Sequence, residues 1–134
     1  MLMNKIFRLK LLYWASRDGD SSASFHNKCD NIRGTITFVK TKTGLIFGGY
    51  TGETWNDGSC CYKTDSKAFC FSIDLRKKYK SKKTIYSIYI NKNKGPCFGN
   101  ALFWVNNNCF KEGGFMNVGF NMNYDNQKKE NEIK

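Results

Sequence analysis

The sequence predicts a mainly β fold with some α structure: two antiparallel sheets packed face to face as a β-sandwich, with short helices at the N-terminal end. Three observations support this. Five or six short segments rich in β-branched and aromatic residues alternate with turn signals. No strand–helix–strand repeat occurs, so a Rossmann-type parallel sheet is not expected. Helical spacing of apolar residues is confined to the first thirty positions.

The first element expected is a short amphipathic helix over residues 6–14. Its apolar residues recur at intervals of three and four, which is the spacing of one helix face. They are Ile6, Leu9, Leu12 and Tyr13. The polar segment at 16–20 follows, and Gly19 is expected to end the helix there.

A second short helix is expected directly afterwards. Ser21 or Ser22 can cap its N-terminus, because a serine hydroxyl accepts a hydrogen bond from the first-turn amides. Phe25 and Cys29 are four residues apart and therefore share one side of this helix.

Beyond Gly34 the pattern becomes strand-like. Residues 36–40 and 45–51 predict two strands joined by a hairpin turn, in which glycine supplies the backbone conformation that such a loop needs. Residues 52–67 are polar and predict a long loop anchored by Trp55 and Tyr62.

The clearest alternation in the chain lies at residues 69–75, where Phe69, Phe71, Ile73 and Leu75 face one side and Cys70, Ser72 and Asp74 face the other. A basic hairpin tip is expected next. Further strands are predicted at 85–90, 102–105 and 115–120, separated by a turn at Gly95-Pro96 and a loop at 106–108.

The chain has 134 residues and a mass of 15.5 kDa, which is the size of one domain. Its 40% hydrophobic and 16% aromatic content excludes a disordered chain. No apolar run approaches the ~18 residues of a membrane span, and Arg8 and Lys10 interrupt any signal-peptide core. A cytoplasmic location is expected. Residues 1–124 are expected to form the domain, and 125–134 a disordered polar tail.

The net charge is strongly positive: 22 Lys and Arg residues minus 11 Asp and Glu residues give +11. Six cations lie between residues 76 and 83, and they could bind a polyanion or an anionic membrane surface. A solvated hairpin tip is the alternative. Sequence-specific nucleic-acid binding is not expected, because guanine is read mainly by arginine and the run has only one. The six are Arg76, Lys77, Lys78, Lys80, Lys82 and Lys83.

The six cysteines predict reduced thiols. Nothing marks the chain as secreted, and only Cys60 and Cys61 are close together, which is not the spacing of a zinc site. These two lie in the predicted 52–67 loop, where Lys63 would favour the thiolate form. A thiol-based antioxidant role through Cys60 or Cys61 is therefore one functional hypothesis.

An enzyme is not expected. His26 is the only histidine, and the few acidic residues form no obvious acid–base pair. Gly48-Gly49 lies inside a strand segment and lacks the lysine of a phosphate-binding loop. No cofactor and no metal are predicted.

Taken together and in order, several segments of the chain resemble the TLDc family, known for oxidation-resistance proteins. These segments are LLYWASRDG (11–19), SFHNKC (24–29), IFGGYT (46–51), Trp55, AFCFS (68–72) and GPCFG (95–99). The resemblance runs from about residue 9 to about residue 124. Relatives usually end in a strand of alternating hydrophobic and acidic residues, which this chain lacks after residue 124.

The resemblance implies a two-sheet β-sandwich, no established catalytic residues, and a non-enzymatic protein-interaction domain linked to oxidative-stress protection. A vacuolar proton-pumping ATPase is the partner implied, because some family members bind it and regulate its assembly. The family-motif residues, structural or interacting, are Ser16, Arg17, Asp18, Gly19, Phe25, His26, Cys29, Phe47, Gly48, Gly49, Tyr50, Trp55, Phe69, Phe71, Gly95, Phe98 and Gly99.

Overall fold

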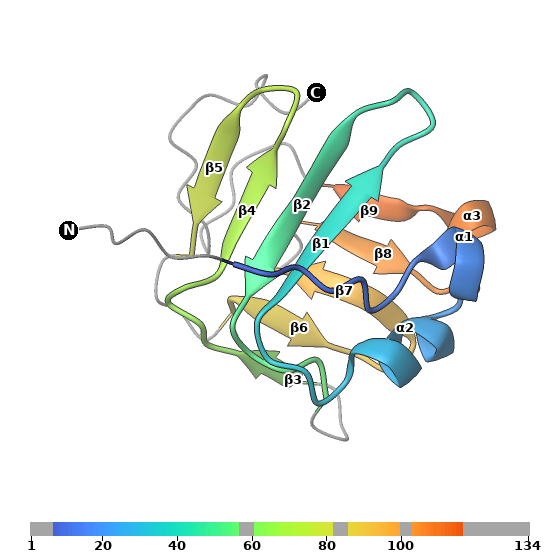
Figure 1. The fold of residues 1–134 in the computed structure, drawn as a ribbon, viewed down its shortest axis with the longest axis horizontal. Coiled ribbons are helices and arrows are strands. Elements are labelled where there is room, and N and C mark those ends of the chain that lie inside the picture. Colours follow the sequence, from blue (N-terminus) through green and yellow to red (C-terminus); the bar gives the residue numbers. More distant parts are fainter. Residues whose placement is uncertain (1–6, 57–60, 82–85, 100–102, 117–134) are drawn as a thin grey trace.

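The computed structural model of the chain describes residues 7–56, 61–81, 86–99 and 103–116. Two antiparallel β-sheets pack face to face, and three short helices gather at one end of the sandwich (Figure 1). The predicted mainly β, two-sheet fold is confirmed. No helix in these residues is long and apolar enough to cross a membrane.

The two sheets differ in size, and all their strand pairs are antiparallel. The four-stranded sheet has the order β1-β2-β4-β5, with β1 (Thr35–Lys40), β2 (Ile46–Thr51), β4 (Phe69–Ser72) and β5 (Lys77–Lys80). The five-stranded sheet has the order β3-β6-β7-β8-β9, with β3 (Cys61–Lys63), β6 (Ile88–Ile90), β7 (Lys94–Phe98), β8 (Phe103–Asn106) and β9 (Gly114–Met116).

The helices are α1 (Ala15–Asp18), α2 (Ser22–Cys29) and α3 (Cys109–Glu112). The predicted helix at 6–14 is wrong, since residues 7–14 contain no helix. The amide of Trp14 donates to the carboxylate of Asp18, so Trp14 caps a helical turn that begins at Ala15. The second helix is confirmed: the hydroxyl of Ser21 accepts from the amide of Ser24 at 3.0 Å.

Two predicted loops contain strands instead. The polar segment at 52–67 includes β3, which pairs with β6. Gly95 and Pro96 form no turn but lie within β7. The register of β7 against β8 shifts between Lys94 and Cys97, and a proline is tolerated at such an irregularity because no regular ladder bond is lost there.

The basic run is also placed differently from the prediction. The turn is formed by residues 73–76, where Arg76 adopts a positive φ of 52°, and the alternating strand ends at Ser72. Lys77, Lys78 and Lys80 belong to β5, which lies at the edge of the four-stranded sheet. Lys82 and Lys83 lie outside the described residues, as do the predicted tail at 125–134 and the strand positions after Met116.

A chain of aromatic rings fills the space between the sheets. Trp55 is 1% exposed and Phe98 is fully buried. Phe25 of α2 contacts Trp55 at 5.7 Å between ring centroids, Trp55 contacts Phe98 at 5.5 Å, and Phe98 stacks on Phe103 at 5.0 Å. Phe47 of β2 contacts Phe103 at 5.2 Å, so the rings join α2 to both sheets.

Two adjacent glycines of β2 are required by contacts on opposite sides of the four-stranded sheet. A Cβ atom at Gly48 would overlap the carbonyl oxygen of Thr37 and approach the ring of Phe71. A Cβ atom at Gly49 would lie 2.7 Å from the ring of Phe98. The backbone therefore approaches both neighbours more closely than any other residue would allow.

We expect Gly49→Ala to lower the free energy of unfolding by about 1–3 kcal/mol, because the added methyl group must displace a fully buried ring. Urea unfolding followed by tryptophan fluorescence measures the change. Gly52→Ala is the matched control, since its Cβ would meet only ordinary contacts at 3.7 Å. Equal stability of the two variants would contradict the prediction.

Candidate functional site

The family-motif residues separate into three groups in the structure. The largest group is buried or half-buried between α2 and the two sheets, where it builds the core. It consists of Phe25, His26, Cys29, Phe47, Gly49, Trp55, Gly95, Phe98 and Gly99. The position of these residues in the core assigns them to folding, and two groups outside the core remain as candidates for interaction.

The first exposed group is the α1 turn with Gly19. The guanidinium of Arg17 donates to both carboxylate oxygens of Asp18 at 2.8 Å, while Ser16 is exposed beside them. These bonds from Arg17, and then the bond from the Trp14 amide, lower the pKa of Asp18 to about 2. Gly19 follows the turn with a φ of 101°, which favours glycine. The result is a fixed turn that exposes Ser16 and Arg17 and keeps the Asp18 carboxylate largely covered.

Tyr13 connects this turn to α2 through a hydrogen bond and a ring contact. Its hydroxyl donates to the carbonyl oxygen of Gly19 at 2.6 Å, and its ring contacts Phe25 at 5.7 Å. Burial, followed by the nearby Cys109 and Asp20, raises the pKa of Tyr13 to about 12. The phenol therefore keeps its proton, which the bond to the carbonyl requires.

Two polar residues that the motif comparison did not single out, Asp20 and Asn107, connect the helical segments. Asp20 accepts from the amide of Phe110 through its carboxylate at 2.9 Å and from the amide of Cys109 through its carbonyl at 3.1 Å. Asn107 accepts from the amide of Ser22 at 2.8 Å. The partners are 85 to 90 positions apart, so no local sequence signal could pair them.

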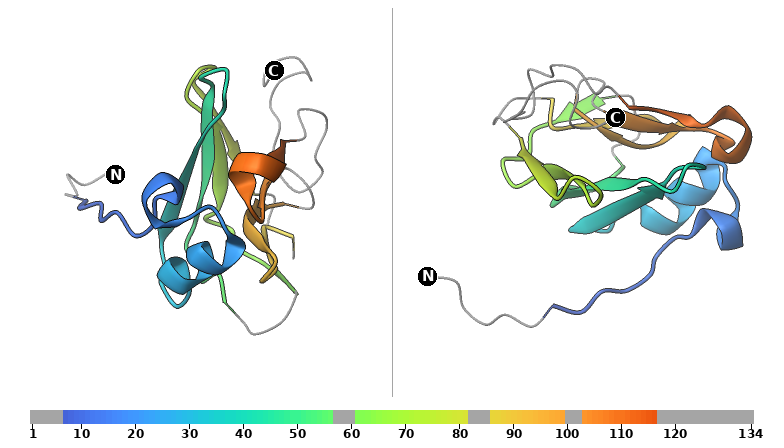
Figure 2. Two further views of the ribbon diagram at one scale, coloured as in Figure 1. Left: turned by 90° about the vertical axis from the view of Figure 1, so that its right-hand side faces the viewer. Right: turned by 90° about the horizontal axis from the view of Figure 1, so that it is seen from above.

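We call Leu11, Trp14, Arg17 and Phe110 the helical-end surface: Leu11 and Trp14 precede α1, Arg17 belongs to α1, and Phe110 belongs to α3. The exposed fractions of the apolar members are 61% for Leu11, 55% for Trp14 and 58% for Phe110. Figure 2 shows α1 and α3 projecting at the same end of the sandwich. The bonds of Asp20 to α3 keep these elements in a fixed relation.

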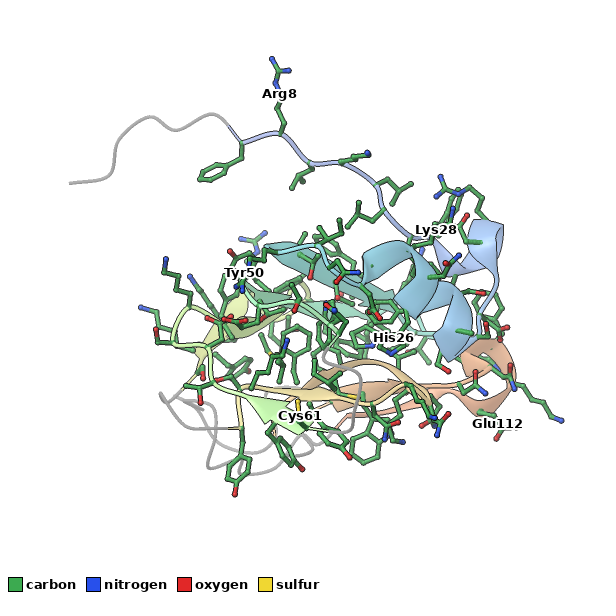
Figure 3. The ribbon with its side chains drawn as sticks, turned by 90° about the horizontal axis from the view of Figure 1, so that it is seen from below. Arg8, His26, Lys28, Tyr50, Cys61 and Glu112 are labelled. Carbon is green, nitrogen blue, oxygen red and sulfur yellow. The ribbon has the colours of Figure 1, made fainter. Side chains whose placement is uncertain are left out.

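His26 joins α2 to the turn between β6 and β7. Figure 3 shows His26 on α2. Its Nε2 atom is 3.0 Å from the carbonyl oxygen of Asn91 and 2.9 Å from that of Lys94, and its Nδ1 atom is 2.7 Å from Asp30. Carbonyl oxygens only accept, so Nε2 carries a proton. His26 therefore acts here as a structural donor.

Among the described cysteines, Cys29, Cys70 and Cys97 are buried, and Cys61 and Cys109 are half-buried. Burial, and then Asp30 and Asp18, raise the pKa of Cys29 to about 11, and burial followed by Asp20 raises the pKa of Cys109. Cys61 lies on β3 and packs against the core, so its predicted loop location is wrong. The ammonium of Lys63 donates to Thr54 and Asn56 in the preceding loop. Cys60 lies outside the described residues.

A buried polar chain connects the sheets at the end opposite α3. The carboxylate of Asp65 accepts from the Thr51 hydroxyl and the Gly52 amide, both at 2.7 Å. The Asp65 amide donates to the hydroxyl of Ser87, which bonds Ser81 at 2.7 Å. An open depression of about 540 Å³ lies beside Asp65, bordered by Arg33 and Lys67.

The depression offers no catalytic pair within the described residues. Both Asp65 oxygens are occupied by hydrogen bonds, the second by the amide of Lys67 at 2.9 Å. No group of three or more His, Cys, Asp or Glu side chains that could hold a metal occurs in the described segments. Sequence reasoning missed Asp65, in a predicted loop, and Ser87, in a predicted strand, because neither residue type gives a sign of burial.

The second group lies on the outer face of the four-stranded sheet, where Tyr50, Phe69 and Phe71 are half-buried. Gly48, Tyr50, Phe69 and Phe71 belong to β2 and β4, and the ammonium of Lys78 on β5 lies 4.2 Å from the centroid of the Phe69 ring. The motif residues on this face are thus joined to the basic run, which sequence reasoning treated as a separate hairpin tip.

We expect His26→Ala to lower the free energy of unfolding by about 1–3 kcal/mol, because two backbone carbonyls in the β6–β7 turn would lose their donor. Chemical denaturation measures the change. Lys28→Ala is the control, since Lys28 is exposed on the same helix. A loss no larger than that of Lys28→Ala would contradict the assigned role.

We expect Cys29 to react with iodoacetamide at pH 8 about a hundredfold more slowly than an ordinary thiol, because the fraction of thiolate falls tenfold per pKa unit between 9.0 and about 11. Its rate should still be rising with pH above 9. Mass spectrometry of the peptide containing Cys29 measures the rate, and the urea-unfolded chain is the reference. Equal rates in the folded and unfolded chain would contradict it.

Comparison with known proteins identifies the family. The family model of the TLDc domain matches residues 2–133, which is nearly the whole chain. Searches of curated proteins and of solved structures found no match. The ordered segments predicted from the sequence, the two-sheet fold and the match of the family model agree, and the chain belongs to the TLDc domain family.

Proposed function

We propose that this protein is a non-enzymatic interaction domain of the TLDc type, acting in the cytoplasm in protection against oxidative stress, and that it binds the vacuolar proton-pumping ATPase. The membership of the TLDc family supports the link to oxidative stress. The pump is the partner implied by the resemblance of the motif segments.

The observation that carries the interaction role is the division of the motif residues. The buried motif residues stabilise the sandwich, whereas Ser16 and Arg17 are exposed near Trp14, and Arg17 is held in place by its bonds to Asp18. A large aromatic side chain exposed on a rigid element is typical of a binding surface. Within the described residues, no nucleophile–base pair competes with this interpretation.

The structure offers less support for the thiol-based alternative. Of the cysteines described, Cys29 and Cys109 have raised pKa values, and Cys61 packs against the core. A low thiol pKa and exposure are what redox-active cysteines require.

We expect the purified chain to bind purified pump sectors, and Trp14→Ser/Phe110→Ser to weaken that binding at least about tenfold, as loss of central aromatic contacts does in other interfaces. Surface-immobilised binding to assembled and dissociated sectors measures it. Phe38→Ser, on a different face and 57% exposed, is the matched control.

Two outcomes would contradict the proposal at different levels. Failure of the unmodified chain to bind any pump sector would reject the partner. Binding that is unchanged in Trp14→Ser/Phe110→Ser would retain the partner and reject the helical-end surface.

A further inference from the structure

The outer face of the four-stranded sheet carries an apolar surface arranged in two cross-strand rows. In one row Ile36 lies opposite Tyr50, and Tyr50 lies opposite Phe69. In the other row Gly48 lies between Phe38 and Phe71. The exposed fractions are 39% for Ile36 and 57% for Phe38.

The rings of these rows lie against one another. Phe38 contacts Phe71 across Gly48 at 5.2 Å between centroids, and Tyr50 stacks on Phe69 at 5.3 Å. Phe69 and Phe71 also contact each other at 6.3 Å, which joins the rows. The rings thus form one continuous layer over β1, β2 and β4. We call this layer, with Ile36, the outer-sheet surface.

Positive charge borders the outer-sheet surface. Both rows end in lysine on β5: Phe69 lies opposite Lys80, and Phe71 lies opposite Lys78. Residues 35–51 and 69–81 contain Asp74 as their one carboxylate, and its oxygen accepts from the amide of Ile46. The same segments contain six cations: Lys40, Lys42, Arg76, Lys77, Lys78 and Lys80.

The segment with Arg8 and Lys10 adds charge on the same side. Figures 2 and 3 show it passing outside the four-stranded sheet, on the side away from the five-stranded sheet. A partner that covers this face must therefore combine apolar groups with negative charge, because desolvated cations without counter-charges would oppose binding.

We propose that the outer-sheet surface binds an amphipathic helix of another protein, with apolar residues facing the rings and acidic residues along the flank that faces β5. Three neighbouring strands span roughly 10 Å, which matches the ~10–12 Å diameter of a helix. The two rows are about 7 Å apart along the strands, close to the ~6 Å between helix positions i and i+4.

The arrangement of the rings distinguishes a helix from other partners. An added strand would pair with the backbone at a sheet edge and leave the face uncovered. A membrane is bound by apolar side chains that project into the lipid, whereas Phe69, Phe71 and Tyr50 are half-buried and lie against their neighbours. A layer of this kind suits packing against a helix face.

The test uses two synthetic helical peptides with leucine at positions i, i+3, i+4 and i+7, one with glutamate and one with lysine along the same flank. Fluorescence anisotropy measures their binding to the purified chain. We expect the glutamate peptide to bind at least about tenfold more tightly than the lysine peptide, and its affinity to fall with salt.

Two double variants locate the site. Phe38→Ser/Lys78→Glu should weaken binding of the glutamate peptide at least about tenfold, while Phe110→Ser/Lys111→Glu, which makes the same changes on α3, should leave it unchanged. Thermal unfolding tests whether both variants are folded. If Phe38→Ser/Lys78→Glu is unfolded, Lys78→Glu/Lys80→Glu is used in its place, and the same loss of peptide binding is expected.

Three results would overturn the proposal: no binding of the glutamate peptide, equal binding of both peptides, or equal loss in both double variants. Vesicles containing anionic phosphatidylserine provide a further arm. Binding of vesicles but not of the glutamate peptide, abolished by the β5 substitutions, would assign the surface to a membrane instead. Because the peptide assay contains no pump subunit, failure of peptide binding and failure of pump binding can be told apart.

Discussion

The structure depends on the close approach of β2 to the ring of Phe98. Gly49 presents no side chain, so the buried ring can lie directly against the strand, between the two sheets. From this position Phe98 contacts Trp55 and Phe103, which connect it to α2 and to β2. The contact between Gly49 of β2 and the ring of Phe98 on β7 thus sets how closely the two sheets approach in the core.

β2 also allows close aromatic packing on the outer face of its sheet. Gly48 leaves room on the outer side for the rings of Phe38 and Phe71 to meet, as Gly49 does for Phe98 on the inner side. Two successive glycines in an otherwise β-branched and aromatic strand therefore permit aromatic packing on both faces of one sheet. The consequence is an apolar outer layer that belongs to the fold rather than to a flexible loop.

The polar residues divide into those that hold elements together and those that remain exposed. His26, Asp20, Asp65 and Lys63 donate to or accept from backbone groups of distant segments, and these bonds fix the helices and loops around the sandwich. These side chains therefore contribute structural hydrogen bonds. The exposed charges of Arg17, Lys78 and Lys80 remain for recognition, which agrees with a domain that binds partners.

The sequence by itself determined the class of fold, the family, the cap of α2 and most strands, because these follow from local alternation, turn residues and ordered motifs. It misplaced a helix at 6–14, a loop at 52–67 and a turn at Gly95-Pro96. In the first case a local bond, from the Trp14 amide to Asp18, marks a helical turn that begins only at Ala15. In the other two cases pairing with distant strands outweighs local preference: β3 pairs with β6, and β7 pairs with β8 in an irregular register. Only the tertiary structure decided which candidate residues are buried and which are exposed. It placed the basic run beside the aromatic rings of β4, since the pairing of β4 with β5 brings Lys78 over Phe69 and no local pattern encodes which face of that sheet the core covers.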